Sequence, residues 1–520
     1  MQVRKIGLAA LGLLAVISAG TTGAVADNPQ ALKARAAAAT ISWAENNGRL
    51  RQVMAAFPKG GDLHNHLRGA VYAESWLKWA AEDGLCVDMK KPAIKFKAAA
   101  TCAASGWITA DEAQNNADDR RRLINAMSVR SYAPENGWSG HDQFFETFNR
   151  INVDPKRLGD ELAMVANRAG HQNVLYLELM ETIVFPELFP LLSDVKLSGN
   201  LDQDYKTLMD GKFGKAMPDL VASVRSQISA AMKRKDELLK CGTKDAKPGC
   251  DVKIRFLHQV IREFNPAMVF GQFILGWEVM KEDPMVVGAN LVAPEDGYIA
   301  LRDYTLHMRM IDYLYRHLGP RNIALHAGEL VPGMVRPDEL RFHIRQAIEI
   351  GHAKRIGHGV DIAYEDNSDQ LLDEMAKKHI MVEINLTSND VILGVKGKNH
   401  PLILYRDKDV PYALSTDDEG VSRIDLTHEY MRYYTTYHIP YFEMRHASRN
   451  SLTYSFLPGA SLWTNGACEK DVEGALKAGA DCKAFLRTSE KARLQWKLEE
   501  RFRTFEDEER IPKRKKTSFN

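Results

Sequence analysis

Eight short apolar segments, separated by stretches of amphipathic helix-like sequence, are the feature that most constrains the fold of this chain. They cover residues 60–66, 174–180, 254–261, 285–293, 323–328, 355–360, 380–386 and 411–416. Near-continuous apolar strands are typical of a parallel sheet that is covered on both faces. Eight such strands alternating with helices predict an α/β fold, a closed (β/α)8 barrel of the TIM type.

Side chains with metal-binding or proton-transferring chemistry occur at or next to the C-terminal ends of four of these segments. The first segment carries His64 and His66, the fifth His326 and Glu329, the sixth His358, and the eighth Asp417 and Asp418. Active sites of (β/α)8 barrels lie at this face. We therefore expect the first, fifth, sixth and eighth strands to contribute to one site.

The residue types in these motifs indicate a hydrolytic metal centre. His64 and His66 are two residues apart, so both project to the same face of an extended strand. Neutral imidazoles together with a carboxylate suit zinc, and such a site can generate hydroxide near neutral pH. The predicted ligands of one zinc ion per chain are His64, His66, His326 and Asp417.

Glu329 lies three residues beyond His326, in the turn above the strand. There it is better placed to exchange protons than to bind metal. The alternative is that Glu329 caps a helix that follows directly.

The N-terminus indicates an exported protein. Arg4 and Lys5 precede the apolar stretch 6–17, and a small-residue segment ends at Ala26. This pattern predicts a cleavable secretory signal over residues 1–26, and hence a secreted or periplasmic protein. The apolar run is shorter than the roughly 20 residues that span a bilayer, so we expect no stable membrane anchor.

The sequence predicts further segments before and after the barrel domain. We expect a helical segment at 27–56, the barrel domain at 57–460, and a helical extension with a basic tail at 461–520. Insertions are expected at about 84–115 and 233–252, and the charged stretch 233–253 is predicted to be a surface loop.

Six cysteines form three local pairs, which enclose polar or Gly/Ala-rich segments. In an oxidising compartment these pairs are predicted to form disulfides. The predicted bonds join Cys86 to Cys102, Cys241 to Cys250, and Cys468 to Cys482. A cysteine-based zinc site is disfavoured because the chain has no CxxC spacing.

Charge composition argues against nucleic acid or an acidic membrane as a partner. The 69 lysines and arginines nearly cancel the 68 aspartates and glutamates. The one strongly basic run, residues 513–516, is expected to be a solvated tail.

The motifs HxH, HAGE, GHG and STDD, in this order, resemble those of the adenosine deaminase family of the amidohydrolase superfamily. The FPKGGDLHNH opening, the YLEL strand and the SRNSLTYSFLP segment at 448–458 are most similar to the secreted, growth-factor-type branch. The resemblance spans roughly residues 30–460.

The resemblance implies a role for each site residue. His64, His66, His326 and Asp417 match the zinc ligands, and Glu329 matches the general acid that protonates the purine ring. His358 matches the residue that orients and helps to deprotonate the attacking water, and Asp418 the acceptor for the purine's five-membered ring.

Two positions depart from the family pattern and concern the substrate. Arg68 stands where adenosine-specific members usually carry an aspartate that holds the sugar, and arginine favours phosphate or carboxylate. A surface or salt-bridged Arg68 is the alternative. Ala293 aligns with a glycine whose backbone N–H contacts the purine, and alanine keeps that donor.

We therefore expect zinc-dependent hydrolytic deamination of adenosine or a related 6-aminopurine nucleoside, giving an inosine-type product and ammonia. One alternative is a hydrolase of the same superfamily that acts on another small molecule, for which Arg68 and Ala293 are the motivating features. The other is a secreted, non-catalytic binding or signalling protein, against which the complete ligand and acid set argues. The alanine-rich helix near 31–56 is compatible with two roles. It forms the interface of a homodimer, or it closes the bottom of the barrel.

Overall fold

The computed structural model describes residues 29–134, 137–152, 155–464, 466–473 and 476–508. At its centre lie two four-stranded parallel sheets, with strand orders β1-β5-β6-β7 and β8-β9-β10-β11. Their strands come from the eight predicted apolar segments. The bounds are β1 (Gly60–His66), β5 (Val174–Glu181), β6 (Lys253–Ile261), β7 (Val286–Val292), β8 (Ala324–Ala327), β9 (Arg355–His358), β10 (Met381–Ile384) and β11 (Tyr412–Leu414).

Isolated backbone bridges link the two sheets at both seams. Asn65 bridges Asp417, and the Asp417 N–H donates to the carbonyl of His64 at 2.8 Å. At the opposite seam Ala289 bridges Ile323. The strands therefore follow one another around the barrel in chain order, and the predicted (β/α)8 fold is confirmed. The four motif-bearing strands end at one mouth.

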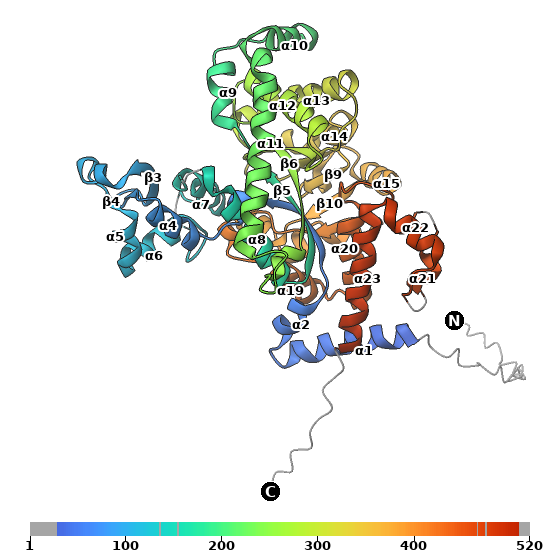
Figure 1. The fold of residues 1–520 in the computed structure, drawn as a ribbon. Coiled ribbons are helices and arrows are strands. Elements are labelled where there is room, and N and C mark those ends of the chain that lie inside the picture. The colour runs from blue at the N-terminus through green and yellow to red at the C-terminus, as the bar shows by residue number, and fades with distance from the viewer. Residues whose placement is uncertain (1–28, 135–136, 153–154, 465, 474–475, 509–520) are drawn as a thin grey trace, which may run out of the picture.

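Helices surround the sheets on the outside, as Figure 1 shows. The strands are apolar because the helices bury their outer faces while barrel side chains fill the inside. Between β6 and β11 the barrel helices are α12 (Pro266–Glu282), α13 (Tyr298–His317), α14 (His343–Glu349), α15 (Ser368–Lys378), α16 (Leu386–Leu393) and α17 (Leu402–Asp407). After β11 come α18 (Glu419–Ser422), α19 (Leu426–Tyr437) and α20 (Tyr441–Thr453).

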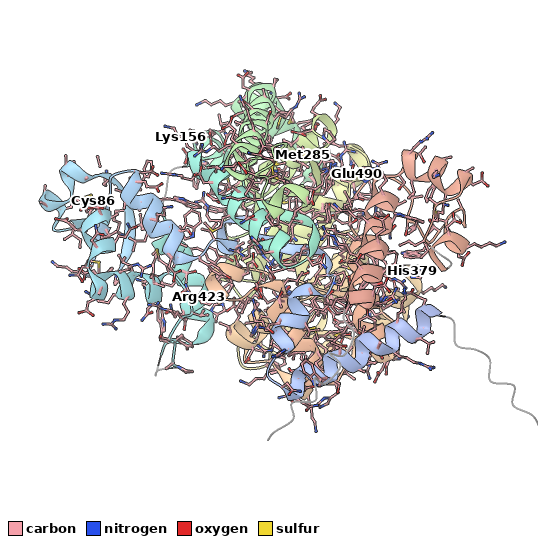
Figure 2. The ribbon with its side chains drawn as sticks, turned by 60° about the horizontal axis from the view of Figure 1, so that its bottom comes forward. Cys86, Lys156, Met285, His379, Arg423 and Glu490 are labelled. Atoms are coloured by element: carbon pink, nitrogen blue, oxygen red, sulfur yellow. A yellow bond between two sulfur atoms is a disulfide. The ribbon has the colours of Figure 1, made fainter. Side chains whose placement is uncertain are left out.

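The connection between β1 and β5 forms a lobe that projects from the side of the barrel (Figure 1), and Figure 2 labels Cys86 within it. It begins with α3 (Leu67–Ala70) and α4 (Ala73–Glu82). An antiparallel sheet follows, with strand order β3-β2-β4. The remaining elements are β2 (Leu85–Asp88), β3 (Ala93–Ala98), β4 (Ile108–Thr109), α5 (Ala110–Asn115), α6 (Ala117–Ala126), α7 (Gly140–Glu146) and α8 (Leu158–His171).

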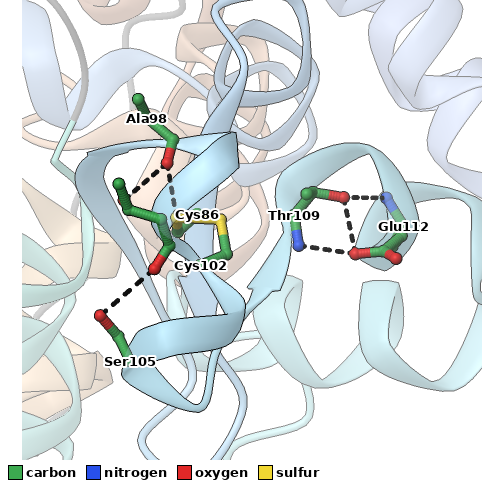
Figure 3. Close-up of a disulfide and its surroundings, with 7 residues drawn as sticks. Cys86, Ala98, Cys102, Ser105, Thr109 and Glu112 are labelled. Carbon is green, nitrogen blue, oxygen red and sulfur yellow. Dashed lines mark hydrogen bonds between the residues drawn. A yellow bond between two sulfur atoms is a disulfide. The ribbon is translucent and has the colours of Figure 1, made fainter.

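A disulfide and a helix cap help to order this lobe. Cys86 is bonded to Cys102, as predicted (Figure 3). In the same view Thr109 and Glu112 form a capping box that starts α5: the Thr109 hydroxyl accepts from the Glu112 N–H at 3.1 Å, and the Glu112 carboxylate accepts from the Thr109 N–H at 2.8 Å.

A helical excursion between β5 and β6 corrects one sequence-based expectation. It consists of α9 (Phe185–Leu192), α10 (Leu201–Asp210) and the long α11 (Lys212–Leu239). Residues 233–239, predicted as surface loop, form the last turns of α11 because Leu239 and the stem of Lys235 are buried among apolar neighbours. High charge at the other positions marks a solvated helix face. The Cys241–Cys250 disulfide then closes the short loop before β6.

The chain termini pack at the opposite end of the barrel from the motifs. The N-terminal segment is two helices, α1 (Pro29–Asn46) and α2 (Leu50–Ala56), separated at Gly48, whose φ is +66°. The C-terminal region has α21 (Glu469–Glu473), α22 (Ala480–Thr488) and α23 (Glu490–Glu508). Rings of Phe502 and Phe505 lie 5.6 and 5.8 Å from that of Phe57, so α23 docks beneath β1.

The third predicted disulfide, Cys468–Cys482, is also present. The predicted signal segment 1–26 and the basic run 513–516 lie outside the described residues. Within the described part of the chain, none of the helices combines the length and apolarity that crossing a bilayer requires.

Candidate active site

A pocket of about 700 Å³ opens at the mouth of the barrel where the motif-bearing strands end. This volume is ordinary for a small-molecule site. Eight of the nine predicted site residues line it, namely His66, Arg68, Ala293, His326, Glu329, His358, Asp417 and Asp418. The ninth, His64, is fully buried below.

The four predicted metal ligands converge at the pocket floor. His66 Nε2 lies 3.2 Å from His326 Nε2. Asp417 Oδ1 lies 3.4 Å from His64 Nε2 and 3.3 Å from His66 Nε2. Residues from the first, fifth and last strands of the barrel thus meet within a few ångströms, as expected from the strand order.

Each of the three ligand histidines faces a hydrogen-bond acceptor with its other ring nitrogen. The Nδ1 atoms of His64, His66 and His326 lie 2.7–2.8 Å from Glu383 Oε2, Gln259 Oε1 and Asn290 Oδ1, respectively. Nδ1 must therefore carry the proton, which leaves the Nε2 lone pair of each ring directed into the cluster. Metal-binding histidines have this arrangement.

The donor set fits a divalent cation. Unprotonated Nε2 atoms of His66 and His326 at 3.2 Å repel one another unless positive charge lies between them. His64 Nε2 is buried without a hydrogen-bond partner among the described residues. Although burial lowers the pKa of His64, its contacts with Asp417 and Glu383 raise that pKa to about 10, so without a metal ion Nε2 also carries a proton, whose place a bound cation would take.

Asp417 is fixed from two sides. Its Oδ2 accepts a hydrogen bond from Ser388 Oγ at 2.6 Å, while Oδ1 faces the histidines. Burial raises the pKa of this carboxyl group, but the bonds to His64 and His66 outweigh it and hold the pKa well below its usual value. Asp417 is therefore an anion, as a ligand of zinc must be.

Glu329 stands beside this cluster in a different protonation state. Burial, together with the charges of Asp417 and Glu295, raises the pKa of Glu329 well above its usual value. The raised pKa favours the protonated carboxyl group, which can act as an acid. No helix begins at Glu329 in the described structure, so the helix-cap alternative is wrong.

Glu295, which the sequence analysis did not single out, holds the turn that carries Glu329. Its carboxylate accepts from the N–H groups of Gly328 and Glu329 at 3.1 and 2.7 Å. His343 Nδ1 lies 2.6 Å from the same carboxylate and keeps it charged despite burial. The acid is thus positioned through the backbone of its own turn.

His358 lies at the end of β9, with φ of +70°. Burial lowers its pKa to about 3, so the ring is neutral. Its Nδ1 lies 2.8 Å from Asn389 Nδ2 on α16. Gly357, just before it, has to be glycine because a Cβ there would lie 2.6 Å from His64 Cε1.

Asp418 is buried beside Asp417, and its Oδ1 lacks a hydrogen-bond partner among the described residues. A Cβ on Gly69 would lie 1.5 Å from this oxygen, so glycine in the LRG motif makes room for the carboxyl group. Burial raises the pKa of Asp418 well above its usual value, which favours the protonated form that can donate a hydrogen bond.

Arg68 lies at the pocket wall, half-buried, and its guanidinium makes no ion pair or hydrogen bond with any residue that the structure describes. The salt-bridged alternative therefore does not apply. Glu161 and Glu181 line the same wall, and burial raises the pKa of both carboxyl groups against the lowering effect of the Arg68 charge. Burial prevails at Glu161 and raises its pKa to about 8.

Ala293 has φ of +89°, a conformation that favours glycine and is strained for alanine. It directly follows β7 and lines the pocket. The backbone geometry expected from the family glycine is therefore kept at a cost of about 1–3 kcal/mol.

The outer wall of the pocket comes from the inserted helices. Phe144 on α7 and Phe148 just beyond it, Leu158 and Glu161 on α8, and Gln227 on α11 line it. The sequence analysis named none of them, because residues on amphipathic inserted helices have no motif that relates them to the barrel mouth.

Comparison with known proteins agrees with this site. Residues 217–461 match the family model described as "Adenosine deaminase". An adenosine deaminase from Clostridium perfringens is 30% identical over 181 residues, which cover 35% of this chain and 51% of that protein. An N6-methyl-AMP deaminase from Danio rerio is 29% identical over 219 residues, covering 40% of this chain and 57% of the relative. The matches thus span about half the length of these relatives.

Solved structures share the fold. An amidohydrolase from Burkholderia ambifaria with bound Zn superposes with a TM-score of 0.51 at 14% identity, covering 88% of this chain and 94% of that one. An adenine deaminase from Arthrobacter aurescens gives a TM-score of 0.50 at 14% identity, covering 77% and 94%. Together with the motif geometry, these matches support the resemblance found in the sequence: residues 217–461 match the adenosine deaminase family, and the chain shares the fold of solved amidohydrolases.

Proposed function

We propose that this protein is a zinc-dependent deaminase that converts a 6-aminopurine nucleoside, with adenosine as the leading candidate, to the 6-oxopurine nucleoside and ammonia. The observation that carries the proposal is the floor of the pocket. Three histidine side chains and one carboxylate converge there, beside a carboxyl group whose pKa is raised well above its usual value.

The residues that would hold zinc are His64, His66, His326 and Asp417. Zinc bound there would supply Lewis-acid activation of water near neutral pH. The ring orientations of the three histidines support this assignment because each is fixed by a separate partner.

Glu329 is the proposed acid of the reaction. When water adds to C6 of the purine, the ring nitrogen N1 gains electron density, and the Glu329 carboxyl group can transfer its proton there. Of the two protons of the added water, one would restore the Glu329 carboxyl group and the other would pass to the amino group, so that cleavage of the C6–N bond releases ammonia and leaves oxygen on C6. The raised pKa of Glu329 supports this direction of transfer.

Asp418 is the proposed partner of the purine's five-membered ring. N7 of adenine is a hydrogen-bond acceptor. A protonated Asp418 therefore donates to N7, which reverses the direction that the family resemblance suggested to us. The backbone N–H of Ala293 is the second proposed purine contact.

Arg68 and its neighbours favour a nucleoside over a nucleotide. The guanidinium offers donors, and the carboxyl groups of Glu161 and Glu181 offer acceptors, on the same wall. Sugar hydroxyls both donate and accept, so they suit this mixture. A phosphate needs an excess of positive charge, and Arg68 is the one lysine or arginine among the described residues that line this pocket.

The deciding experiment uses the purified protein from Asp27 onward, with metal analysis and a panel of adenosine, deoxyadenosine, adenine, AMP and N6-methyl-AMP. We expect one zinc per chain and the highest kcat/KM for a nucleoside. Preference for AMP or N6-methyl-AMP would refute the substrate class. Absence of turnover across the panel with full zinc content would refute the deaminase and favour the non-catalytic or other-substrate alternatives.

Export is part of the proposal. The predicted signal at 1–26 and the three disulfides support it, because disulfides persist in oxidising compartments. N-terminal sequencing of protein from the secreted or periplasmic fraction should begin at Asp27. Recovery of the full-length chain from the cytoplasm alone would contradict export.

A further inference from the structure

The histidine at the end of β9 differs from the three ligand histidines in what its Nδ1 faces. For His64, His66 and His326 the neighbour of Nδ1 is an oxygen acceptor. For His358 the neighbour is the Nδ2 of Asn389, at 2.8 Å. An amide nitrogen is a donor, but amide oxygen and nitrogen can exchange places, so the orientation of Asn389 has to be established independently.

His400 establishes that orientation. Its Nε2 lies 2.9 Å from Asn389 Oδ1, and its Nδ1 accepts the backbone N–H of Leu402 at 3.1 Å. A backbone N–H donates and never accepts, so Nδ1 of His400 carries no proton and Nε2 carries it. Burial lowers the pKa of His400 to about 3, which keeps the ring neutral and excludes a second ring proton.

The direction of the whole chain of hydrogen bonds follows. Leu402 N–H donates to His400 Nδ1, and His400 Nε2–H donates to Asn389 Oδ1. Asn389 Nδ2–H then donates to His358 Nδ1. All three side chains are at most 3% exposed, so water does not offer a competing arrangement. Glu329 Oε1, 3.6 Å from His358 Nδ1, is beyond hydrogen-bond distance.

We infer that Asn389 and His400 are positioning residues that fix His358 as the tautomer with its proton on Nε2, so that His358 presents a hydrogen-bond donor to the reacting group and is not a metal ligand. Nε2 of His358 has no partner among the described residues, and the ring lies 4.9 Å from the ring of His64. This step rests on the proposed function, under which His358 donates a hydrogen bond to the oxygen that adds at C6. Proton acceptance at Nε2, which the family resemblance implied, is excluded by the same tautomer.

The key variant is Asn389→Asp, which replaces the donor Nδ2 with a carboxylate oxygen. His358 Nδ1 then faces an acceptor, like the three ligand histidines, and its proton should move from Nε2 to Nδ1. We expect kcat to fall roughly 100-fold, the loss seen when one preorganised donor is removed, with KM little changed. The matched control is Asn450→Asp, another buried asparagine, whose Nδ2 donates to the carbonyl of Tyr412 at 3.0 Å.

The direct readout is the ring nitrogen resonances of zinc-loaded protein labelled with 15N-histidine, with His358 assigned by its loss in His358→Gln. Wild type and Asn450→Asp should show a protonated Nε2 at His358, and Asn389→Asp a protonated Nδ1. A wild-type His358 protonated on Nδ1 would overturn the inference, whether or not the protein deaminates adenosine. Lack of deaminase activity with the expected resonances would instead refute only the proposed function.

A second pair of variants tests His400. His400→Gln keeps an N–H donor for Asn389 Oδ1, so we expect it to retain the Nε2 tautomer and most of the activity. His400→Phe removes the donor, and His358 should become a mixture of tautomers with reduced kcat. Equal resonances and equal kcat in the two variants, with both folded by circular dichroism, would also overturn the inference.

Discussion

The floor and the wall of the pocket are built on different principles. Floor residues come from the ends of barrel strands, and the four metal-ligand candidates and the acid each have an identified partner that sets their charge or orientation. Wall residues come largely from inserted helices, and two of their charged groups, Arg68 and one oxygen of Glu161, have no hydrogen-bond partner among the described residues. The floor is therefore preorganised for one reaction, whereas the wall keeps polar groups available for a substrate.

We therefore expect the floor residues to determine kcat and metal binding, and the wall residues to determine KM and substrate preference. Changes on the floor should alter kcat or metal binding by large factors, because partners are already fixed and nothing can compensate. Changes on the wall should alter KM and substrate preference by small factors, because exposed or half-buried groups are partly solvated.

The largest effect is expected at Glu329 on the floor. Glu329→Gln keeps the shape of the side chain but removes the transferable proton, so kcat should fall by roughly 1,000-fold or more while zinc content stays at wild-type level. Asp361→Asn is the matched control, since Asp361 is also buried with a raised pKa but does not line the pocket. An unchanged kcat in Glu329→Gln would contradict the assigned role.

The next largest effect is expected on zinc binding, and variants of the neighbouring residues Asp417 and Asp418 are compared to test it. Zinc added to metal-free protein should raise its stability by about 4 kcal/mol at a concentration 1,000 times Kd. Asp417→Asn should remove most of this stabilisation, whereas Asp418→Asn should keep it, because only Asp417 faces the histidines. Thermal melts with and without zinc measure both. Equal responses of the two variants would show that Asp417 is not a ligand.

The wall should respond more weakly and through KM. At a pH above about 8, where Glu161 is ionised, Glu161→Gln removes a negative charge beside Arg68, so the KM for AMP should fall about tenfold relative to that for adenosine, with kcat for adenosine unchanged. Glu187→Gln serves as control because Glu187 lines the same pocket but is exposed. If both variants change the AMP to adenosine ratio equally, then Glu161 has no special part in selectivity.

The difference between floor and wall also explains which site residues could be predicted from the sequence. His64 and Asp417 are recognisable because each follows a run of apolar residues that can only be a buried strand, and a barrel brings such ends together. Glu383 and Asn290 carry a weaker signal, a single polar residue inside an apolar strand. Glu161 carries none, because a helix of the insertion gives no sign of which face it turns to the pocket.

Asn389 and His400 show a further limit of sequence. Both are ordinary polar residues after β10, and their role depends on which atoms face each other at 2.9 Å. The wrongly predicted loop at 233–239 has a related cause. Its charges predict solvent exposure correctly for one face of α11, but the buried Leu239 that keeps the helix intact is visible only in the packing.

The smallest effect is expected where the wall is attached to the floor. His141 on α7 lies 2.9 Å from Asp296 Oδ1 in the loop after β7, and its ring lies 4.7 Å from that of Phe145, which lines the pocket. Burial lowers the pKa of His141, but the hydrogen bond and charge of Asp296 outweigh it and raise the pKa above its usual value.

The sign of the pH dependence follows from that direction. A raised pKa in the folded state means that the ion pair stabilises the protein fully below the unfolded pKa of about 6.5, and that this contribution is lost as pH rises through the folded pKa. The difference in the free energy of unfolding between wild type and Asp296→Asn, measured by thermal melts, should therefore be larger at about pH 5.5 than at about pH 8.5, and amount to about 1 kcal/mol or less. His141→Gln combined with Asp296→Asn should show no additional loss. An equal difference at both pH values would mean that α7 is held by its apolar contacts and not by this ion pair, and a difference that grows toward alkaline pH would contradict the assigned sign.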